Sequence, residues 1–344
     1  MEEYFHRVTR QTPTRLWINN PTLEEADKAI AAGAISCTTN PTYSYKQILR
    51  EPNYALGAVD EVIRETEDDN EAADLIQEKL AKRIMDRFLP LYERNPGKQG
   101  FVSIQGSPYG DDDPKRIIEE SLRYRELSRN AIAKIPATKA GLEAIEVLIA
   151  EDVPIIATEV MAISQAIYTC ELYQQVSEES GNHPPFYLTH ITGIFDEHLK
   201  NVVDREGIDV SSDVLWQAGC IVARKQYRIF KERGYYGIML GGGARGLQHF
   251  TEMVGADMHI TINWKGTADK LIETNPPVVC RIDTPAPRHV INELEEIPDF
   301  RKAYLEDGLT IEEFKGYGPV DLFRSSFLKG WDSLLETIRQ RREF

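Results

Sequence analysis

Eight short apolar segments recur along the chain, and longer amphipathic segments separate them. Most of the short segments are apolar on both alternating faces, which is typical of parallel strands that are covered by helices on one side and packed inside on the other. Helix-start signals between them include Thr22, which precedes Leu23-Glu24-Glu25, and Thr138. We therefore expect strands at 15–20, 34–40, 101–107, 131–137, 153–160, 186–192, 235–240 and 256–262.

Eight strands that alternate with helices favour a (β/α)8 barrel, the TIM barrel, over a doubly wound sheet. Such a barrel needs about 250 residues, so the 344 residues of the chain allow one barrel with extra N- and C-terminal helices. We expect a single domain over residues 1–344, with the barrel at about 15–275. The interval 42–100 must hold at least two helices. Residues 289–344 are predicted to be helical decoration that closes one side of the barrel, with a helix start at Thr310.

The overall composition limits the classes of function. A net charge of −15 argues against a general nucleic-acid binder, although a local basic pocket can still hold a small phosphate. No run of about 18 consecutive apolar residues is present, so no membrane span is expected, and residues 1–6 show no secretory signal. The four cysteines are far apart and the seven histidines show no metal-binding spacing. We therefore expect reduced thiols in a cytoplasmic protein, with no metal and no cofactor.

One lysine stands out from its surroundings. Lys134 lies within residues 131–137, a run that is otherwise without charge. An ammonium group in the middle of a barrel strand must be desolvated, which favours the neutral amine. A neutral amine is a nucleophile toward a ketone or an aldehyde, and this attack is the first step of Schiff-base catalysis. The alternative is a lysine that snorkels from the end of its strand to the surface.

Two polar positions near strand ends bear on this choice. The motif TTNP at 38–41 ends the second strand, and Asn40 is placed to bind sugar hydroxyls at the carboxyl ends of the strands, where barrel active sites lie. Thr158 ends the fifth strand, beside the fourth strand and Lys134. Taken alone, TTNP is typical of a turn and a lone strand threonine is usually structural. The functional interpretation of both positions therefore depends on the neighbourhood of Lys134.

The glycine-rich segment Gly241–Gly246 (GGGARG) follows the seventh predicted strand. It satisfies the pattern GxGxxG of dinucleotide-binding sites, but it lies far from the N-terminus and no acidic residue ends a strand about 20 residues later. After strand seven of a barrel, such glycines suggest a phosphate cradle instead. In that cradle Gly243 and Arg245 bind substrate, with exposed amides and a helix N-terminus around the anion. A glycine-rich connecting loop with an exposed arginine is the alternative.

Several segments together resemble transaldolase, the Schiff-base aldolase family of the pentose phosphate pathway. The most specific is KIPAT followed by GL, within 134–142, and the similar segments extend over nearly the whole chain. They lie at 16–41, 133–148, 153–166, 243–262, 309–319 and 327–338. The resemblance implies a small-molecule sugar or sugar phosphate as the partner. Because transaldolases are often dimers, it also allows a homodimer.

The resemblance places several functional residues of the family on this chain. The Schiff-base lysine of the family falls on Lys134, the asparagine of TNP on Asn40, and the strand-five threonine on Thr158. The strand-six serine falls on Thr189, which keeps a hydroxyl group. The arginine of the phosphate loop falls on Arg245.

Three positions depart from the family pattern. The first-strand aspartate, a general acid and base, falls on Asn19, and the third-strand glutamate, which moves protons through water, falls on Gln105. Both changes keep the shape and the hydrogen bonding but remove a proton-accepting carboxylate. The related fructose-6-phosphate aldolase branch also has glutamine on the third strand but keeps the aspartate, so Asn19 is the more serious departure. The second phosphate-binding arginine falls on Ile194, which indicates either an unusual substrate tail or a cradle in which Arg245 and backbone amides suffice.

The missing carboxylates predict either slow activity or a substitute group, since positioned general acid–base groups contribute about 10²–10⁴ in rate. Glu159 and His190 are candidates, because each lies beside a site residue. Strand alternation, however, predicts that both side chains point away from Thr158 and Thr189.

We therefore expect a divergent transaldolase-like enzyme that transfers a dihydroxyacetone unit from a ketose to an aldose acceptor. Lys134 forms the Schiff base, and Asn19, Gln105 and Thr158 assist it. One alternative is an aldolase or lyase that uses the same lysine on another ketose and releases its product to water. Another is a catalytically impaired sugar-binding relative, which would account for Asn19 and Gln105 together. A dinucleotide-binding oxidoreductase is disfavoured, because the only glycine motif of the chain follows the seventh predicted strand.

Overall fold

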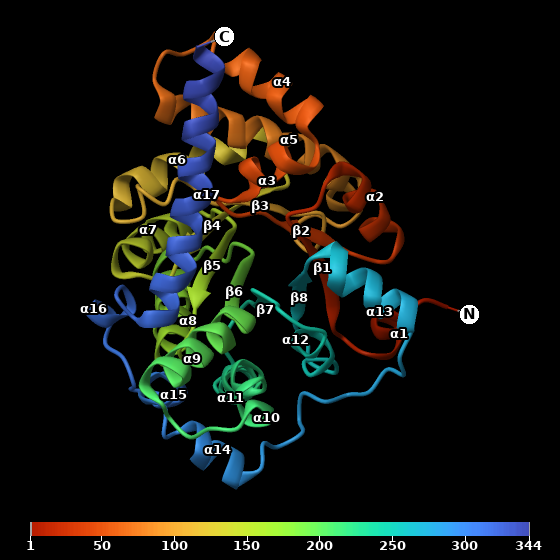
Figure 1. Cartoon of the computed structure of the whole chain (residues 1–344), viewed down its shortest axis with the longest axis vertical. Helices are drawn as coiled ribbons and strands as arrows, with labels where there is room; N and C mark the ends of the chain where they lie inside the picture. Colours follow the sequence, from red (N-terminus) through yellow and green to blue (C-terminus); the bar gives the residue numbers. More distant parts are fainter. Residues whose placement is uncertain (1, 344) are drawn as a thin grey trace.

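The computed structural model describes residues 2–343, in which eight parallel strands close into a barrel (Figure 1). Strands that are consecutive in the sequence are neighbours in the barrel, and β8 pairs with β1. This confirms the predicted (β/α)8 barrel. The strands are β1 (Arg15–Asn19), β2 (Ser36–Thr38), β3 (Val102–Ile104), β4 (Ala131–Pro136), β5 (Ile155–Val160), β6 (Phe186–Ile191), β7 (Ile238–Gly242) and β8 (His259–Ile262).

Helices surround the barrel, and further helices precede and follow it (Figure 1). Helix α1 (Tyr4–Gln11) precedes β1. The helices between and after the strands are α2 (Leu23–Ala31), α3 (Tyr43–Arg50), α4 (Pro52–Val62), α5 (Asp69–Arg94), α6 (Pro114–Leu127), α7 (Lys139–Ala150), α8 (Ile163–Ser180), α9 (Gly193–Glu206), α10 (Ser212–Leu215), α11 (Ala218–Glu232), α12 (Gln248–Thr251) and α13 (Asp269–Thr274). The C-terminal helices are α14 (Arg288–Leu294), α15 (Pro298–Tyr304), α16 (Ile311–Phe314) and α17 (Gly318–Arg342).

The predicted helix starts are found where the sequence signals lie. The Thr22 hydroxyl accepts a hydrogen bond from the backbone N–H of Glu25 at 3.2 Å, and the Glu25 carboxylate accepts one from the backbone N–H of Thr22 at 3.0 Å. This reciprocal pair satisfies two amides that the first turn of α2 leaves free. The Thr138 hydroxyl caps α7, and Thr310 precedes α16, where its backbone N–H donates to the Glu313 carboxylate at 2.9 Å. The interval 42–100 holds three helices, α3 to α5.

The seventh strand lies later in the chain than the pattern predicted. It covers Ile238–Gly242 instead of 235–240. Gly237, just before it, has a φ of +97°, and a Cβ atom there would lie 2.5 Å from Phe186 Cδ1. At the other end, Gly242 belongs to the strand, and its Cβ would lie 3.0 Å from Thr189 Cγ2. Part of the predicted glycine loop is therefore strand, and Gly242 leaves space beside Thr189 inside the barrel.

A layer of large apolar side chains forms a floor inside the barrel. Trp17 Nε1 donates a hydrogen bond to His259 Nδ1 at 2.9 Å, and the Trp17 ring meets Tyr187 edge to face with centroids 5.0 Å apart. Because alternate residues of a strand point to the same face, the residues two positions after this floor also point inward, one layer nearer the carboxyl ends. The floor cluster comprises Trp17, Phe101, Ile132, Ile156, Tyr187 and Leu240.

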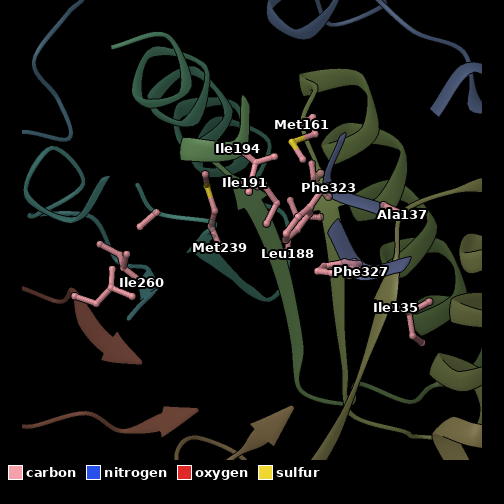
Figure 2. Close-up of a cluster of buried hydrophobic side chains, with 14 of the residues drawn as sticks. Ile135, Ala137, Met161, Leu188, Ile191, Ile194, Met239, Ile260, Phe323 and Phe327 are labelled. Carbon is pink, nitrogen blue, oxygen red and sulfur yellow. The ribbon is translucent and has the colours of Figure 1, made fainter. Parts of the chain in front are cut away.

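The larger core lies between the barrel and its helices. Figure 2 shows Phe323 and Phe327 of α17 reaching toward Leu188 of β6, with Met161 nearby. The two phenylalanine rings are 4.3 Å apart, and both side chains are buried. Helix α17 also packs on α3, α5 and α9 and contacts β5, so its charged residues come close to the barrel interior. Within residues 2–343, no helix combines the length and the apolar character needed to cross a membrane.

Candidate active site

Seven positions form the layer directly above the apolar floor, near the carboxyl ends of the strands. Each lies two residues after a residue of the floor cluster or, on β8, two residues after His259, the hydrogen-bonding partner of Trp17. Strand alternation therefore points each of these side chains inward. Barrel active sites are built at this end of the strands. The layer consists of Asn19, Ser103, Lys134, Thr158, Thr189, Gly242 and Thr261. The structure thus brings together the four strand residues among them that the sequence had singled out.

Lys134 lies in β4, where its side chain is enclosed. The residue is only 7% exposed, and its neighbours Ala133 and Ile135 are buried as well. Burial lowers the pKa of Lys134 from 10.5 to about 8, and the carboxylate of Glu159 opposes part of this decrease. The side chain therefore does not snorkel to the surface. A substantial fraction of its amine is neutral near physiological pH, as nucleophilic attack requires.

Gln105 lies beside Lys134. The pairing of Ile104 with Ala133 places the next residues, Gln105 and Lys134, side by side at the carboxyl ends of β3 and β4. The amide Nε2 of Gln105 donates a hydrogen bond to Glu159 Oε1 at 3.0 Å. Three adjacent strands therefore contribute an amide, an amine and a carboxylate to one point inside the barrel.

The position of Glu159 corrects the expectation from strand alternation. That expectation was wrong, because β5 contains a bulge at this residue: the pairing of β5 with β6 shifts register between Ala157 and Val160. Glu159 has a φ of +62°, which is uncommon for a residue with a side chain. A bulge re-aims the side chain of the extra residue. The carboxylate of Glu159 consequently meets Gln105, and burial raises its pKa from 4.5 to about 7.

Charged residues from outside the strands act on this carboxylate. Arg324 of α17 lowers the pKa of Glu159 and Asp321 of the same helix raises it, while Asp111 of the loop after β3 is a further carboxylate close to Glu159. Arg324 donates a hydrogen bond from Nη2 to the carbonyl oxygen of Pro108 at 2.8 Å, and its Nε lies 3.5 Å from Asp111 Oδ2. Arg324 carries no signal in the sequence, because nothing there shows which side of α17 meets the barrel.

Three buried polar atoms in the barrel interior lack a hydrogen-bonding partner among the described residues: Thr158 Oγ1, Thr189 Oγ1 and Gln105 Oε1. All three residues are almost completely buried. An unpaired buried hydroxyl or carbonyl costs about 1–3 kcal/mol. These groups are therefore available to a bound ligand or to water.

Neutral groups line the opposite side of the interior. Thr38 donates a hydrogen bond from Oγ1 to Asn19 Oδ1 at 3.0 Å, and Asn19 donates one from Nδ2 to Asn263 Oδ1 at 3.0 Å. The Thr38 hydroxyl also lies 2.7 Å from that of Thr261. This network fixes the amide of Asn19 in one orientation. It joins β1, β2 and β8 and contains no carboxylate.

Asn40 has a clear structural role in the turn after β2. Its Oδ1 accepts hydrogen bonds from the Thr42 backbone N–H at 3.1 Å and from the Thr42 hydroxyl at 2.7 Å. The backbone of Asn40 also accepts a hydrogen bond from Tyr43 N–H at the start of α3. The side chain therefore shapes the turn through its oxygen and keeps its two N–H donors for another partner.

Hydrogen bonds to the His249 side chain fix the glycine loop after β7. The backbone N–H groups of Arg245 and Gly246 both donate to His249 Nδ1, at 2.9 and 3.2 Å. The predicted set of free amides is therefore wrong for these two, because the His249 side chain turns back to accept them. Gly243 has a φ of +67°, and a Cβ atom on it would lie 2.5 Å from Ile191 Cγ2, so close packing requires a glycine here.

The Arg245 guanidinium group lies at the protein surface. Its Nε donates to Glu197 Oε2 of α9 at 3.1 Å, and both side chains are about half exposed. The repulsion of Arg245 and Arg50 helps to lower the pKa of Lys46 on α3, after the larger effect of burial. Lys46 is thus a second cation on the Arg245 side of the barrel. No motif in the sequence singles out Lys46, because nothing local shows which side of α3 meets the Arg245 loop.

Two further sequence candidates lie away from the interior. Ile194 is buried and packs near Ile191 (Figure 2), so the site has no cation at this position. His190 lies on the outward face of β6, beside Gln226 of α11, as strand alternation predicted. Burial lowers the pKa of His190 to about 4, so its ring is neutral.

The closed (β/α)8 barrel and the enclosed lysine at the carboxyl end of β4 define the class of this protein as a barrel of the aldolase type. The model of one family, described as Transaldolase/Fructose-6-phosphate aldolase, matches residues 16–307. The chain belongs to this family.

Curated relatives match over shorter stretches. A transaldolase of Helicobacter pylori (strain Shi470) is 26% identical over 214 residues, which cover 59% of this chain and 63% of the relative. A transaldolase of Trichodesmium erythraeum is 30% identical over 135 residues, covering 35% and 36% of the two chains. A transaldolase of Mycobacterium tuberculosis (strain H37Rv) is 25% identical over 210 residues, covering 58% and 55%. In these matches the chain spans between about a third and somewhat under two thirds of the relatives' length.

Proposed function

We propose that this protein transfers a dihydroxyacetone unit from a ketose to an aldose acceptor through a Schiff base on Lys134. The enclosed, easily deprotonated amine in β4 is the observation that carries this proposal. Membership of the Transaldolase/Fructose-6-phosphate aldolase family supports it.

The reaction begins when the neutral Nζ of Lys134 attacks the C2 carbonyl of the ketose. Loss of water gives an iminium ion, which withdraws electrons and allows the C3–C4 bond to break. The enamine of dihydroxyacetone that remains on Lys134 then adds to an aldehyde acceptor. We expect the hydroxyl groups of the donor to bind the unpaired hydroxyl of Thr158 and the amide of Asn19, with Asn40 contributing from the turn after β2.

A sugar phosphate is the substrate class that the charges favour. Arg245 and Lys46 place two cations on one side of the barrel, and a phosphate can replace the Glu197 carboxylate as the partner of Arg245. A substrate of this kind fits the carbohydrate metabolism of the pentose phosphate pathway. A homodimer and a cytoplasmic location remain predictions.

Borohydride trapping with a panel of ketoses tests the covalent step. The protein is incubated with dihydroxyacetone, fructose 6-phosphate or other ketoses, reduced, digested and analysed by mass spectrometry. We expect a ketose-dependent mass increase on the peptide that contains Lys134, formed faster as the pH rises from acid toward neutral, because a growing fraction of the amine is then neutral. If no ketose modifies that peptide, the proposal fails and a sugar-binding protein becomes the better interpretation, as the neutral network around Asn19 would suggest.

Comparison of turnover with and without an acceptor aldehyde separates two enzymatic functions. A transferase consumes ketose much faster when the acceptor is present. An aldolase or lyase that releases its product to water shows the same rate in both cases.

The Arg245→Ala variant is expected to raise KM for a phosphorylated ketose about 10- to 100-fold, because a hydrogen bond to a charged group contributes about 1.5–3 kcal/mol. The KM for dihydroxyacetone, which lacks a phosphate, should stay unchanged. Glu197→Gln is the matched variant. It removes the carboxylate that holds Arg245 Nε at 3.1 Å and should lower the KM for the phosphorylated donor. Steady-state kinetics with both donors check this, and an equal change for both donors would contradict a role in phosphate binding.

A further inference from the structure

Building on the proposed Schiff-base function, we propose that Glu159 is the acid and base that makes and breaks the imine at Lys134. The carboxylate that first-strand and third-strand positions lack is present on the fifth strand. Its hydrogen-bonding partner Gln105 is the strand neighbour of Lys134.

Geometry carries this assignment. Glu159 is 1% exposed and accepts a hydrogen bond from Gln105 Nε2 at 3.0 Å, and Gln105 is the strand neighbour of Lys134. The carboxylate of Glu159 and the amine of Lys134 also shift each other's pKa through their charges, without forming a direct ion pair. A second carboxylate oxygen of Glu159 remains for a proton-transfer partner.

The backbone at Glu159 is strained in a way that serves this placement. A φ of +62° in a residue with a side chain costs about 1–2 kcal/mol. Without the bulge, alternation would turn the Glu159 side chain outward, away from Lys134. Strain of this kind persists where surrounding structure holds it, and it is common at functional sites. At this point of β5 it has one visible effect, which is to bring a carboxylate into the interior.

The charges that face Glu159 come from three elements. Lys134 of β4 and Arg324 of α17 favour its ionised form, whereas Asp321 of α17 and Asp111 of the loop after β3 oppose it. Burial is the largest effect and raises the pKa of Glu159 to about 7. Its carboxyl group can therefore both donate and accept a proton near neutral pH, which is the condition for efficient acid–base catalysis.

The chemical step balances with these two groups alone. The Lys134 amine attacks C2 of the ketose, forming the C–N bond, and one amine proton passes to the former carbonyl oxygen. The neutral carboxyl of Glu159 then gives its proton to that hydroxyl group, which leaves as water. The nitrogen lone pair forms the C=N bond of the iminium ion, and Glu159 is left as a carboxylate. In hydrolysis, the carboxylate takes a proton from the attacking water.

Oxygen exchange isolates this step from carbon–carbon cleavage. Each cycle of imine formation and hydrolysis replaces the C2 oxygen of the ketose with oxygen from water. The rate is measured with dihydroxyacetone in ¹⁸O-labelled water by mass spectrometry, with the Lys134→Met variant as the background. We expect Glu159→Gln to slow exchange by about 10²–10⁴. Glu78→Gln, which alters another buried carboxylate on α5 that pairs with Arg123, should exchange at the wild-type rate.

A double variant separates the carboxylate from its structural role. Gln105→Glu combined with Glu159→Gln keeps an amide–carboxylate pair across the same hydrogen bond and moves the carboxylate to β3. We expect the double variant to exchange oxygen more than tenfold faster than Glu159→Gln alone. If the double variant is as slow as the single one, the loss comes from disturbed packing and the assignment of Glu159 is overturned.

The pH dependence provides the readout that a structural role would not change. In the wild type, exchange should rise as Lys134 loses its proton and fall as Glu159 loses its own, which gives a bell-shaped profile. In Glu159→Gln the falling limb should vanish, and exchange should continue to rise until Lys134 is deprotonated. The pKa of Lys134 itself should be lower than in the wild type, because the carboxylate no longer stabilises the ammonium. Wild-type exchange with an unchanged profile in Glu159→Gln overturns the role of Glu159 but leaves the Schiff base intact. A wild type that exchanges no faster than Lys134→Met overturns the proposed function itself.

Discussion

Lys134→Met is expected to reduce donor-dependent turnover by at least about 10⁴-fold, because the covalent route needs the lone pair of the Lys134 amine. Methionine is unbranched and apolar, so it fits the enclosed space in β4 and removes a charge that burial disfavours. Lys134→Arg keeps a cation but stays protonated at any working pH, so we expect it to be equally inactive. Steady-state turnover of a ketose with an aldehyde acceptor measures both variants.

Lys139→Met is the matched control for this loss. Lys139 begins α7 five residues after Lys134, but its side chain is exposed and lies 3.5 Å from Glu312 at the surface. The same substitution there should leave turnover unchanged. Wild-type turnover in Lys134→Met would show that the reaction does not pass through this amine, and the Schiff-base mechanism would be wrong.

The fold was predictable because the signals for it are local and repeated. Each strand is a short apolar run, and the cap residues Thr22, Thr138 and Thr310 precede helices as their side chains predict. The observed strand limits differ from the predicted ones by up to a few residues, most clearly at β7. Strand alternation also places Lys134 and Thr158 inward, since each follows a floor residue by two positions.

The rest of the site depends on geometry that the sequence pattern does not contain. Glu159 points inward because β5 bulges, and the bulge carries no glycine that would reveal its positive φ. The two loop amides of Arg245 and Gly246 are occupied because His249 turns back toward them. Arg324 comes close to the interior only because α17, about 190 residues after Lys134 in the sequence, packs against the barrel. Each of these features depends on backbone geometry or on contacts between segments, which a local sequence pattern cannot show.

These contacts divide the barrel interior into two chemically different sides. On the β1, β2 and β8 side, Asn19, Thr38 and Thr261 form a neutral network of hydroxyl and amide groups. On the β3, β4 and β5 side lie the ionisable groups Lys134 and Glu159. The neutral side offers hydroxyl and amide groups for hydrogen bonding, whereas the groups that titrate near neutral pH lie on the other side.

The second large expected effect is a loss of stability when the apolar floor beneath these groups is altered. Trp17→Ala is expected to lower the free energy of unfolding by about 3–5 kcal/mol, because a fully buried large aromatic side chain leaves a cavity that the closed barrel cannot fill. It also removes the N–H donor for His259 Nδ1, and burial lowers the pKa of His259 to about 3, so that ring is a neutral acceptor.

Trp17→Phe separates the two contributions. It retains much of the ring volume against Tyr187 but removes the hydrogen bond, so we expect a smaller loss of about 1–3 kcal/mol. Urea unfolding of the three proteins at pH 7 measures the difference through the midpoints, provided that the slopes are equal. If Trp17→Phe is as unstable as Trp17→Ala, the hydrogen bond to His259 and not the ring volume supports the floor. The layer that holds Lys134 would then depend on a single polar contact beneath it.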